Sequence, residues 1–327
     1  MRAAYINQTG PADLITVGDL PRPELKPGQV LVRIRAVAFN PIDLYVRSGA
    51  VSMPMTFPYV VGTDFAGMIE ALGPGISLHR VGDRVWGSNQ GLTGRQGAAS
   101  EFAAIDEDLA YPTPEGQSDI DAAAQALVGI TAHLGLFGHG KLQSRETVYV
   151  PGGTGGVGSM VVQMAKATGA RVATSAGSPD RVALCRTLGA DLALNYKTDD
   201  IPTRLREFAP DGFDVWFETH REPNLEVSVP LLRLRGRMVI IAGRAAKPVI
   251  PIGSFYTRNC SLLGFAMFNA SPVEQRAAAE DITRWSKAGL LKPLIAQTFP
   301  LEEAAKAQRA MEENTLVGPG KVVLEVG

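Results

Sequence analysis

Cysteine and histidine are scarce in this chain of 327 residues, which has two cysteines and four histidines. Cys185 and Cys260 cannot build a disulfide framework, and we expect both to serve as small hydrophobic residues. A catalytic zinc needs about three ligands from Cys, His, Asp or Glu, and a structural zinc needs a cysteine cluster. The histidines show no such spacing: His79, His133, His139 and His220. We therefore expect no metal, with His79 and His139 at the surface and His133 in the core or a pocket wall.

Charge of one sign and long hydrophobic runs are also missing. The net charge is −1, and acidic and basic residues are interspersed, which argues against nucleic acid as the primary partner. No uninterrupted apolar run reaches the roughly 18 residues that a membrane span needs. The first ten residues lack the apolar core of a signal peptide. We expect a cytoplasmic protein that does not enter the membrane.

The sequence pattern changes once along the chain, from short β-like runs to alternating strands and helices. Residues 1–110 hold short β-like runs separated by Gly and Pro, such as 29–37, 65–72 and 84–86, which predicts a mostly antiparallel β domain. From about residue 120, strands alternate with helices, which predicts βαβ units and a parallel sheet. The predicted strands are 147–151, 171–175, 191–194, 213–218, 236–242 and 260–267, and the predicted helices are 121–136, 156–168, 179–188, 201–208 and 224–234.

The last part of the chain does not extend this alternation. Helices are predicted at 272–288 and 301–313, with a final strand at 320–326. We therefore assign residues 1–123, completed by 268–327, to the first domain and 124–267 to the dinucleotide-binding domain. Cys260–Met267 would form a strand at the sheet edge, where a second subunit could pair.

Residues 147–158 carry the most specific motif, because a β-rich run is followed by glycines and then by a helix-forming run. Gly153, Gly155 and Gly158 spell G-x-G-x-x-G. In this context the glycines allow a tight turn, backbone approach to a diphosphate and close packing of the helix on the strand. A glycine turn that only links a strand to a helix is the alternative. We expect a dinucleotide here.

The next strand favours NADPH over NADH. An NAD-binding fold usually has an acidic residue about 20 positions past the glycines, but this strand ends with Ser175, Gly177 and Ser178. Asp180 fits the first turn of a helix, with Ser178 as its N-cap. Arg181 would add positive charge for a 2′-phosphate. An ordinary solvated helix residue is the alternative for Arg181.

Six segments together resemble a known family. They are 40–49 (Asn-Pro-Ile-Asp-Leu-Tyr-Val-Arg-Ser-Gly), 62–67 (Gly-Thr-Asp-Phe-Ala-Gly), 81–85, 151–158, Asn195-Tyr196 and Gly320-Lys321. In this order they resemble the zinc-independent quinone oxidoreductases, the zeta-crystallin-like branch of the medium-chain dehydrogenases/reductases. The resemblance implies an α/β protein with a GroES-like, mostly-β catalytic domain and a doubly wound parallel-sheet (Rossmann) domain. The zinc-ligand positions of metal-dependent relatives correspond to 38–40 and Thr63, which offer no Cys or His.

The resemblance also implies the site residues. Asn40, Thr63 and Thr131 would orient the nicotinamide ring and the substrate carbonyl. The residues implied to contact the cofactor are Tyr45, Gly153, Thr154, Gly155, Gly156, Val157, Ser175, Gly177, Ser178, Arg181, Tyr196, Ala242, Gly243, Arg244, Phe265, Ala266, Met267 and Lys321. Alternatives exist: Asn40 could start a turn, Thr63 could belong to one, Thr131 could bond its own helix, and Tyr45 could pack in the core.

Other features of the pattern are local. Asp43 and Arg47 lie four apart and would form an ion pair on a helix. The sequence Thr-His-Arg-Glu after Glu218 departs from the small, amide-bearing residues of relatives. Residues 86–100 are expected to form a flexible loop.

The expected function is that of an NADPH-dependent, zinc-free quinone oxidoreductase acting on a small molecule. No strong general acid is evident in the sequence.

 

Two alternatives stay open for the function. One is an NADPH-dependent enoyl or 2-alkenal reductase, which acts on an α,β-unsaturated carbonyl. The other is a non-catalytic NADPH-binding structural or sensing protein. A reduced quinone can take its proton from water, which suits a site without a general acid. The edge strand makes a homodimer the expected assembly.

Overall fold

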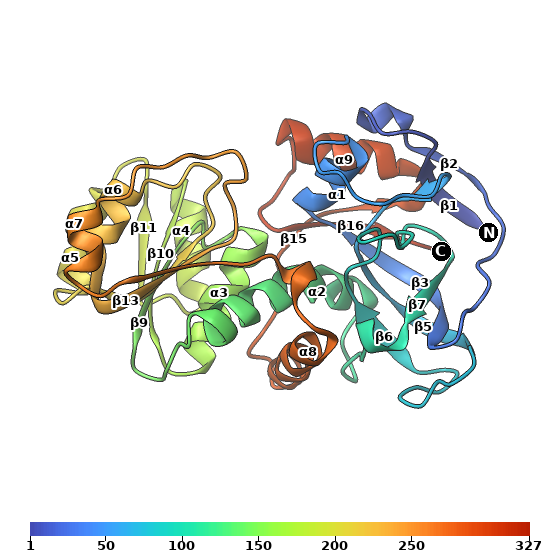
Figure 1. Cartoon of the computed structure of the whole chain (residues 1–327), viewed down its shortest axis with the longest axis horizontal. Helices are drawn as coiled ribbons and strands as arrows, with labels where there is room; N and C mark the ends of the chain where they lie inside the picture. Colours follow the sequence, from blue (N-terminus) through green and yellow to red (C-terminus); the bar gives the residue numbers. More distant parts are fainter. The chain divides into compact units, whose positions relative to one another are not determined.

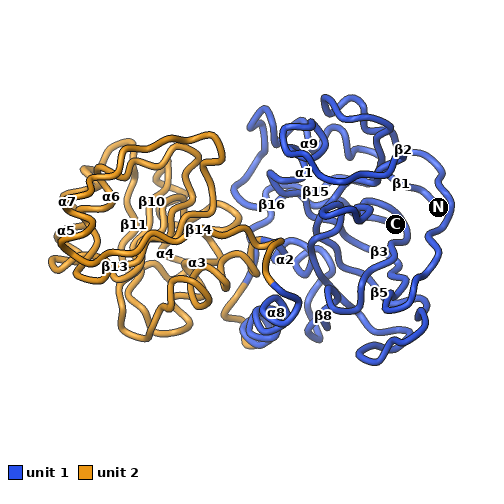
Figure 2. Tube along the Cα trace, in the orientation of Figure 1, with its two compact units in different colours: residues 1–127, 271–287, 292–327 blue, residues 128–270, 288–291 orange.

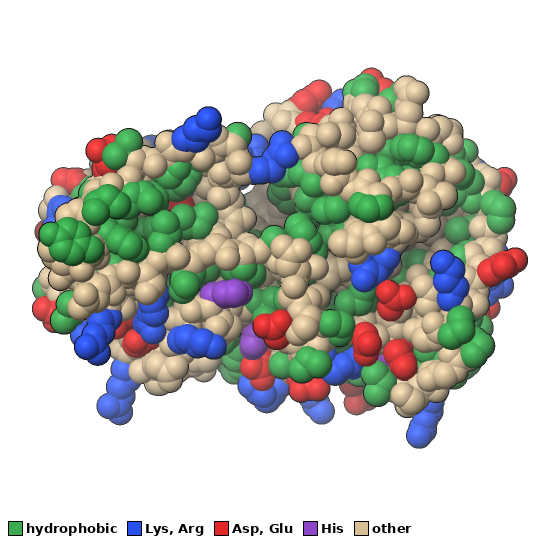
Figure 3. All heavy atoms as spheres, viewed as in Figure 1, with side chains coloured by type: hydrophobic (Ala, Val, Ile, Leu, Met, Phe, Trp, Pro, Cys, Tyr) green, Lys and Arg blue, Asp and Glu red, His purple; other side chains and the backbone are tan.

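The computed structural model describes all residues, 1–327, and Figure 1 shows its helices and strands. The chain divides into two compact units (Figure 2). Unit 1 comprises Met1–Leu127, Ser271–Lys287 and Lys292–Gly327, and unit 2 comprises Val128–Ala270 and Ala288–Leu291. On the face drawn in Figure 3, acidic and basic side chains are interspersed over each unit.

Unit 1 is built on two β-sheets. The larger sheet has seven strands in the order β15-β16-β3-β5-β6-β8, with β7 paired to β3. All its pairs are antiparallel except β15–β16. Its strands are β3 (Gln29–Phe39), β5 (Asp64–Leu72), β6 (Arg84–Gly87), β7 (Phe102–Asp106), β8 (Ala110–Pro112), β15 (Ile295–Pro300) and β16 (Lys321–Glu325). The smaller sheet has the order β2-β1-β4, from β1 (Arg2–Ile6), β2 (Thr16–Asp19) and β4 (Tyr59–Val60).

The last strand of the chain lies inside the larger sheet. β16 pairs antiparallel with β3, placing Val322 opposite Phe39, and parallel with β15 on its other side. The side chains of Val322–Leu324 in this inner strand are fully buried or nearly so. The sequence analysis missed β15, whose residues Ile295–Pro300 are mostly half-exposed and lack a clear apolar alternation.

Three helices lie wholly in unit 1: α1 (Pro41–Arg47), α8 (Pro272–Lys287) and α9 (Ala304–Glu313). Its 3₁₀ turns are η1 (Ala12–Leu14), η2 (Glu107–Leu109) and η6 (Leu301–Glu303). A capping box formed by Asn40 and Asp43 starts α1. The predicted ion pair between Asp43 and Arg47 is wrong. Asp43 accepts from the backbone N–H of Asn40 at 2.7 Å, while the buried Arg47 pairs with Glu312.

Unit 2 contains a six-stranded sheet whose neighbouring strands are all parallel. Its strand order is β11-β10-β9-β12-β13-β14. The strands are β9 (Thr147–Pro151), β10 (Arg171–Ala176), β11 (Leu192–Asn195), β12 (Phe213–Glu218), β13 (Leu232–Ile240) and β14 (Ser261–Gly264). Counted along the chain this is the order 3-2-1-4-5-6 of a doubly wound dinucleotide fold. The predicted fold class is confirmed.

The connections of unit 2 are α3 (Gly156–Ala167), α4 (Pro179–Thr187), α5 (Ile201–Phe208), α6 (Leu225–Ser228) with η4 (Val229–Leu231), and α7 (Ile252–Tyr256). The predicted helix 224–234 is too long, because the chain already turns into β13 at Leu232. Leu231 and Leu232 pack in the core with Phe213 and Trp216, and this packing overrides the helical propensity of the segment. The turn η5 (Met267–Asn269) follows β14, which ends at Gly264 rather than 267.

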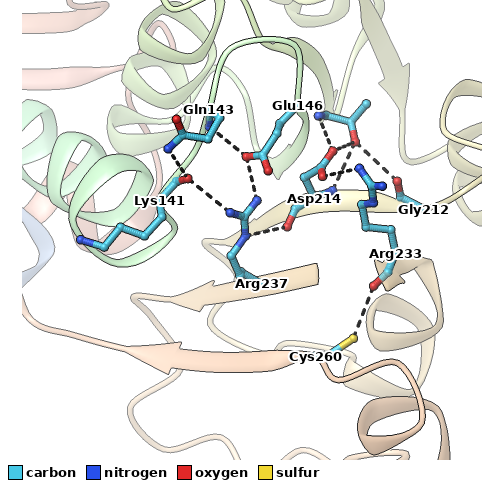
Figure 4. Close-up of polar contacts among 9 residues, drawn as sticks. Lys141, Gln143, Glu146, Gly212, Asp214, Arg233, Arg237 and Cys260 are labelled. Atoms are coloured by element: carbon cyan, nitrogen blue, oxygen red, sulfur yellow. Dashed lines mark hydrogen bonds and ion pairs between the residues drawn. The ribbon is translucent and has the colours of Figure 1, made fainter. Parts of the chain in front are cut away.

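A polar network fixes the amino ends of the central strands in unit 2 (Figure 4). The buried carboxylate of Asp214 accepts from the backbone and hydroxyl of Thr147 at 2.8 and 2.9 Å and from Arg233 at 2.7 Å. Arg237 pairs with Glu146 at 2.7 Å. Ligands of doubly wound sheets bind at the carboxyl ends of the strands. Because this network lies at the amino ends, we assign it a structural role.

One long apolar helix runs from α2 (Asp119–His133) into the π-helical turn η3 (Leu134–His139). By length and composition Asp119–His139 could cross a membrane, but 78% of its apolar window is buried inside the structure. A helix buried to this extent inside the protein is a core helix. His133 is buried within it.

Two predictions about exposed segments are wrong. His79 is buried and its Nε2 lies 3.3 Å from the carbonyl oxygen of Glu107, whereas His139 is exposed as predicted. Residues 86–100 are largely buried rather than a loose loop, because the hydroxyl of Tyr59 donates to the carbonyl of Gly91 at 2.6 Å and anchors the segment.

Candidate functional site

The glycine turn between β9 and α3 is packed too closely for side chains. A Cβ at Gly158 would lie 2.2 Å from the carbonyl oxygen of Gly152, and a Cβ at Gly153 would lie 2.2 Å from Thr174 Oγ1. Gly152 itself has φ +69°. The glycines therefore let α3 start directly against the end of β9, which is the geometry predicted from the motif.

The first turn of α3 presents free backbone donors. Its N-cap is Gly155, which has no side chain to cap the helix, and the first amide to bond back is Ser159 N, 2.9 Å from Gly155 O. The N–H groups of residues 156–158 have no carbonyl partner within the helix. Together with the helix dipole, these donors fit a diphosphate.

The end of β10 supplies the neighbouring group of predicted residues. The hydroxyl of Ser175 is buried and lies 2.9 Å from the Tyr149 hydroxyl, so its side chain belongs to the sheet. Ser178 caps α4 by accepting from Arg181 N at 3.4 Å. A Cβ at Gly177 would lie 2.4 Å from the hydroxyl oxygen of Tyr196. The turn at Gly177 and the ring of Tyr196 are therefore in contact.

Arg181 stands on the first turn of α4 and is exposed. None of its guanidinium nitrogens bonds to a protein group in this structure, so the cation is available to an anion from solution. It lies three residues past Ser178 and four past Gly177. These residues fit a phosphate on the adenosine ribose, because a phosphate needs hydrogen-bond donors and positive charge.

The end of β12 holds a pair that the sequence analysis did not identify as functional. The carboxylate of Glu218 is buried and accepts from His220 N at 2.8 Å, from His220 Nδ1 at 3.0 Å and from Trp216 Nε1 at 3.1 Å. The hydroxyl of Thr219 donates to the carbonyl of Pro151 at 2.8 Å. The pair thus lies beside the glycine turn. The sequence did carry a signal for this pair, because an acidic residue and a histidine stand two positions apart at the end of a predicted strand.

The hydrogen bonds between Glu218 and His220 shift the pKa values of both residues. Burial acts to raise the pKa of Glu218, but the hydrogen bonds from His220 outweigh it and the pKa is lowered. The hydrogen bond to Glu218 raises the pKa of His220. Both shifts favour a carboxylate next to an imidazolium.

The ends of β13 and β14 carry the remaining predicted residues of unit 2. Gly243 has φ +86°, and a Cβ there would lie 3.2 Å from the carbonyl oxygen of Arg221. Ala242 and Arg244 flank it. Phe265 stacks on His139 with ring centroids 4.5 Å apart, and Met267 is buried. Ala266 lies between them. All these residues follow strand ends on the carboxyl side of the sheet.

Unit 1 brings Asn40 and Thr63 together in a buried polar cluster. The side-chain amide of Asn40 donates to Thr63 Oγ1 at 2.9 Å and to Asp64 Oδ2 at 2.7 Å. The hydroxyl of Thr63 donates to Asp43 Oδ2 at 3.0 Å. Lys321 donates to the carbonyl of Phe39 at 2.7 Å and to the side-chain carbonyl of Asn40. The polar groups of Asn40 are therefore engaged by the protein.

Burial dominates the electrostatics of this cluster. It raises the pKa of Asp43 to about 7 and also raises the pKa of Asp64, against the opposing effect of Lys321. Burial likewise lowers the pKa of Lys321. Asp64 has further support from the hydroxyl of Ser88 at 2.6 Å.

The remaining predicted residues are placed separately. Tyr45 is half-buried in α1 of unit 1, and Lys321 is enclosed in the polar cluster. Thr131 is buried in the part of α2 that belongs to unit 2. Thr154 is buried in the glycine turn, where Gly156 and Val157 begin α3.

A zinc ion does not fit the residues present. No three His, Cys, Asp or Glu side chains are grouped closely enough to hold a metal ion. In the polar cluster the two acids, Asp43 and Asp64, face the ammonium group of Lys321 instead. Such a set lacks both the ligand number and the ligand types of a zinc site.

Comparison with known proteins identifies the family. Residues 26–115 match the alcohol dehydrogenase GroES-like domain, and residues 156–284 match the family described as zinc-binding dehydrogenase. A quinone oxidoreductase of Rattus norvegicus is 31% identical over 309 residues, which cover 94% of this chain and 92% of the relative. The chain belongs to the quinone oxidoreductase family. The predicted family and the GroES-like character of the β-rich unit are thus confirmed, and the family is one of oxidoreductases.

Solved structures share the fold over the full length. The crystal structure of an NAD-dependent alcohol dehydrogenase is 31% identical, with a TM-score of 0.90 and 100% coverage of both chains. A mycobacterial protein solved in complex with NADPH is 27% identical, with a TM-score of 0.86, covering 99% of this chain and 100% of that chain.

Proposed function

We propose that this chain is an NADPH-dependent oxidoreductase that passes reducing equivalents to a quinone without zinc. The observation that carries the proposal is the pairing of two anion sites on neighbouring strand ends of unit 2. One is the uncapped first turn of α3, and the other is the unpartnered guanidinium of Arg181. A diphosphate and a 2′-phosphate are the two anionic groups of NADPH.

The bound nicotinamide would supply the reducing equivalents, and the chain supplies binding, orientation and a dry surface. The N–H groups of residues 156–158 hold the diphosphate, with Thr154 beside them. Arg181, Ser178 and Tyr196 hold the adenosine 2′-phosphate. The residues on the nicotinamide side are Ala242, Gly243, Arg244, Phe265, Ala266 and Met267. Apolar cover such as Phe265 keeps water from the ring.

The polar cluster of unit 1 has a positioning role in this proposal. Asn40 and Thr63 stay predictions as catalytic residues, and their hydrogen bonds support an action through the cluster rather than direct contact with the acceptor. Lys321, which bonds to Asn40 within the cluster, has the same indirect role in the proposal. Tyr45 and Thr131 remain proposed contacts of cofactor and substrate. We also propose domain boundaries near 124 and 268, and a location in the cytoplasm.

A homodimer through unit 2 is part of the proposal. β14 is the last strand of its sheet, and its outer side has no partner in this chain. Exposed apolar side chains lie close along the sequence on α7 and around β14: Val249, Ile252, Tyr256 and Leu262. Figure 3 shows hydrophobic side chains gathered over the end of unit 2 where α7 lies. An open edge beside apolar residues suits a second copy.

The test is NADPH oxidation against a panel of quinones and enones, repeated with NADH and with a chelator. We expect quinone reduction with NADPH preferred and with activity unchanged by the chelator. Reduction of enones alone would select the enoyl or alkenal reductase instead. Binding of NADPH with no acceptor reduced would select a sensing or structural protein. Loss of activity with the chelator would contradict a zinc-free reaction.

A further inference from the structure

The pair of Glu218 and His220 has a geometry that a purely structural role does not require. Glu218 is buried and already receives hydrogen bonds from Trp216 Nε1 and from the backbone of His220. The imidazole adds a third bond through Nδ1 at 3.0 Å, yet its side chain is 53% exposed. Because Nδ1 faces the carboxylate, Nε2 is directed away from it and has no protein partner.

The location of the pair follows from the sheet order. β9 and β12 are neighbours, and the chain leaves them toward opposite sides of the sheet, which makes their carboxyl ends the switch point of the fold. The hydroxyl of Thr219 reaches the carbonyl of Pro151 at 2.8 Å, and Pro151 directly precedes the glycine turn. His220 is the next residue, one Cα step of about 3.8 Å further on. Its imidazole is thus a side chain's reach from the turn.

The charged groups near the imidazole lie on its own segment and on the loop after β13. Glu218 is the acid that contacts it. Arg221 and Glu222 follow on the same segment and are exposed. The loop after β13 packs against this segment at Gly243 and carries Arg244. The turn after β9, residues 152–156, contributes no titratable group.

We propose that His220 is a cofactor-binding residue whose Nε2 donates to the diphosphate of the dinucleotide, with Glu218 as the positioning residue that orients the imidazole. This inference rests on the proposed function only in that the glycine turn binds a dinucleotide. An imidazolium opposite a diphosphate forms a hydrogen bond in which donor and acceptor are both ionised, whereas the N–H groups of α3 are neutral donors. No general acid role for His220 is implied.

The experiment is a fluorescence titration of NADPH in the absence of any acceptor, from pH 6 to pH 9. The wild-type protein is expected to bind more weakly as the pH rises, because His220 loses its charge. His220→Gln should bind about tenfold more weakly at pH 6, since it loses a charge-assisted hydrogen bond, and its affinity should change little with pH. Arg204→Gln removes an exposed cation on α5 and should behave as wild type.

Two further measurements distinguish a direct contact of His220 with the diphosphate from an effect of His220 on the fold. Glu218→Gln should move the pH midpoint of NADPH binding downward, because it removes the carboxylate that raises the pKa of His220. The fragment 2′-AMP carries the 2′-phosphate but no 5′-phosphate, so His220→Gln should bind it as tightly as wild type does, while Arg181→Ala should bind it more weakly. A thermal melt of each variant checks that it is folded.

The outcomes distinguish this inference from the proposed function. Equal NADPH affinity of wild type and His220→Gln at every pH would overturn the role of His220 and leave the proposed function standing. Equal weakening toward NADPH and 2′-AMP would also overturn it, since the effect would then lie in the fold or the adenosine site. The expected binding pattern without any quinone reduction would defeat the proposed acceptor and support the role of His220.

Discussion

The ammonium group of Lys321 lies 3.4 Å from the carboxylate of Asp64, and both side chains are almost entirely buried. Removing one partner leaves an uncompensated buried charge, whereas removing both leaves none. We therefore expect Lys321→Met to lower the free energy of unfolding by about 3–5 kcal/mol. Urea denaturation followed by circular dichroism measures the change.

Two controls accompany this prediction. The double variant Lys321→Met with Asp64→Asn should regain part of the loss. Lys306→Met removes an exposed lysine that pairs with Glu303 on the surface, and should change stability by less than about 1 kcal/mol. A loss from Lys306→Met as large as that from Lys321→Met would contradict the special role of burial.

Asp43 should make the stability of the protein depend on pH. Its pKa is raised from 3.8 to about 7 in the folded state, so the folded protein holds this proton more tightly than the unfolded chain does. The stability from this group is full below about pH 3.8 and is lost as the pH rises through about 7. Asp43→Asn should therefore show a smaller fall in Tm between pH 5 and pH 8 than wild type. Identical pH profiles would show that Asp43 ionises normally, and the exposed Asp108→Asn serves as the comparison.

Gly158→Ala should weaken cofactor binding strongly. Its Cβ would lie 2.2 Å from the backbone carbonyl of Gly152, so the first turn of α3 must move away from β9. We expect at least a tenfold loss of NADPH affinity by fluorescence titration. Gly253→Ala meets nothing within 4 Å and should bind normally. Normal binding by Gly158→Ala would show that the helix start can shift without harm.

Arg181→Ala should narrow the preference for NADPH over NADH. A charge-assisted hydrogen bond contributes about 1.5–3 kcal/mol, so the KM for NADPH should rise roughly tenfold or more while the KM for NADH stays constant. Arg204→Ala, which removes an exposed arginine from α5, is the matched control. Steady-state kinetics with both nucleotides measure the ratio, and an unchanged ratio would place the 2′-phosphate elsewhere.

Leu262→Lys should disrupt the proposed dimer. Leu262 lies on the edge strand β14 and is 36% exposed, and a charge on a pairing edge opposes association. Light scattering after size exclusion should show wild type as a dimer and the variant as a monomer. Val317→Lys places the same charge at a residue that is 87% exposed in unit 1 and should leave the dimer intact. A monomeric wild type would end this part of the proposal.

Local patterns were enough to predict the doubly wound sheet. The run from Thr147 to Gly158 combined a buried strand, a glycine turn and a helix, and each had its own signal. The boundary near Leu232 could not be predicted in this way, because the packing of Leu231 and Leu232 with distant residues decides where β13 starts. Tertiary contacts of this kind leave no mark in periodicity.

The polar residues show the same limit more sharply. Asp43 and Arg47 have the spacing of an ion pair, yet partners 20 and 265 residues away in sequence bind them. Asn40 and Thr63 could be selected as important, but only the structure shows that they bond to each other. The sequence shows His220 only as a departure from relatives, and its contact with Glu218 in the structure is the basis of the role that we propose for it.

The place of β16 in the middle of its sheet sets an order on biosynthesis. Lys321 bonds to Phe39 across 282 positions. The segment Ala36–Phe39 of β3, which pairs with β16, therefore keeps an open edge until the ribosome has released residues beyond 321, although β5 and β7 are available to the rest of β3 much earlier. The parallel sheet of unit 2 is complete once β14 has emerged, well before that time. The half of the protein that is translated first is therefore the half that finishes folding last, and its unpaired strand edge is open to chaperones or to misassembly throughout the interval.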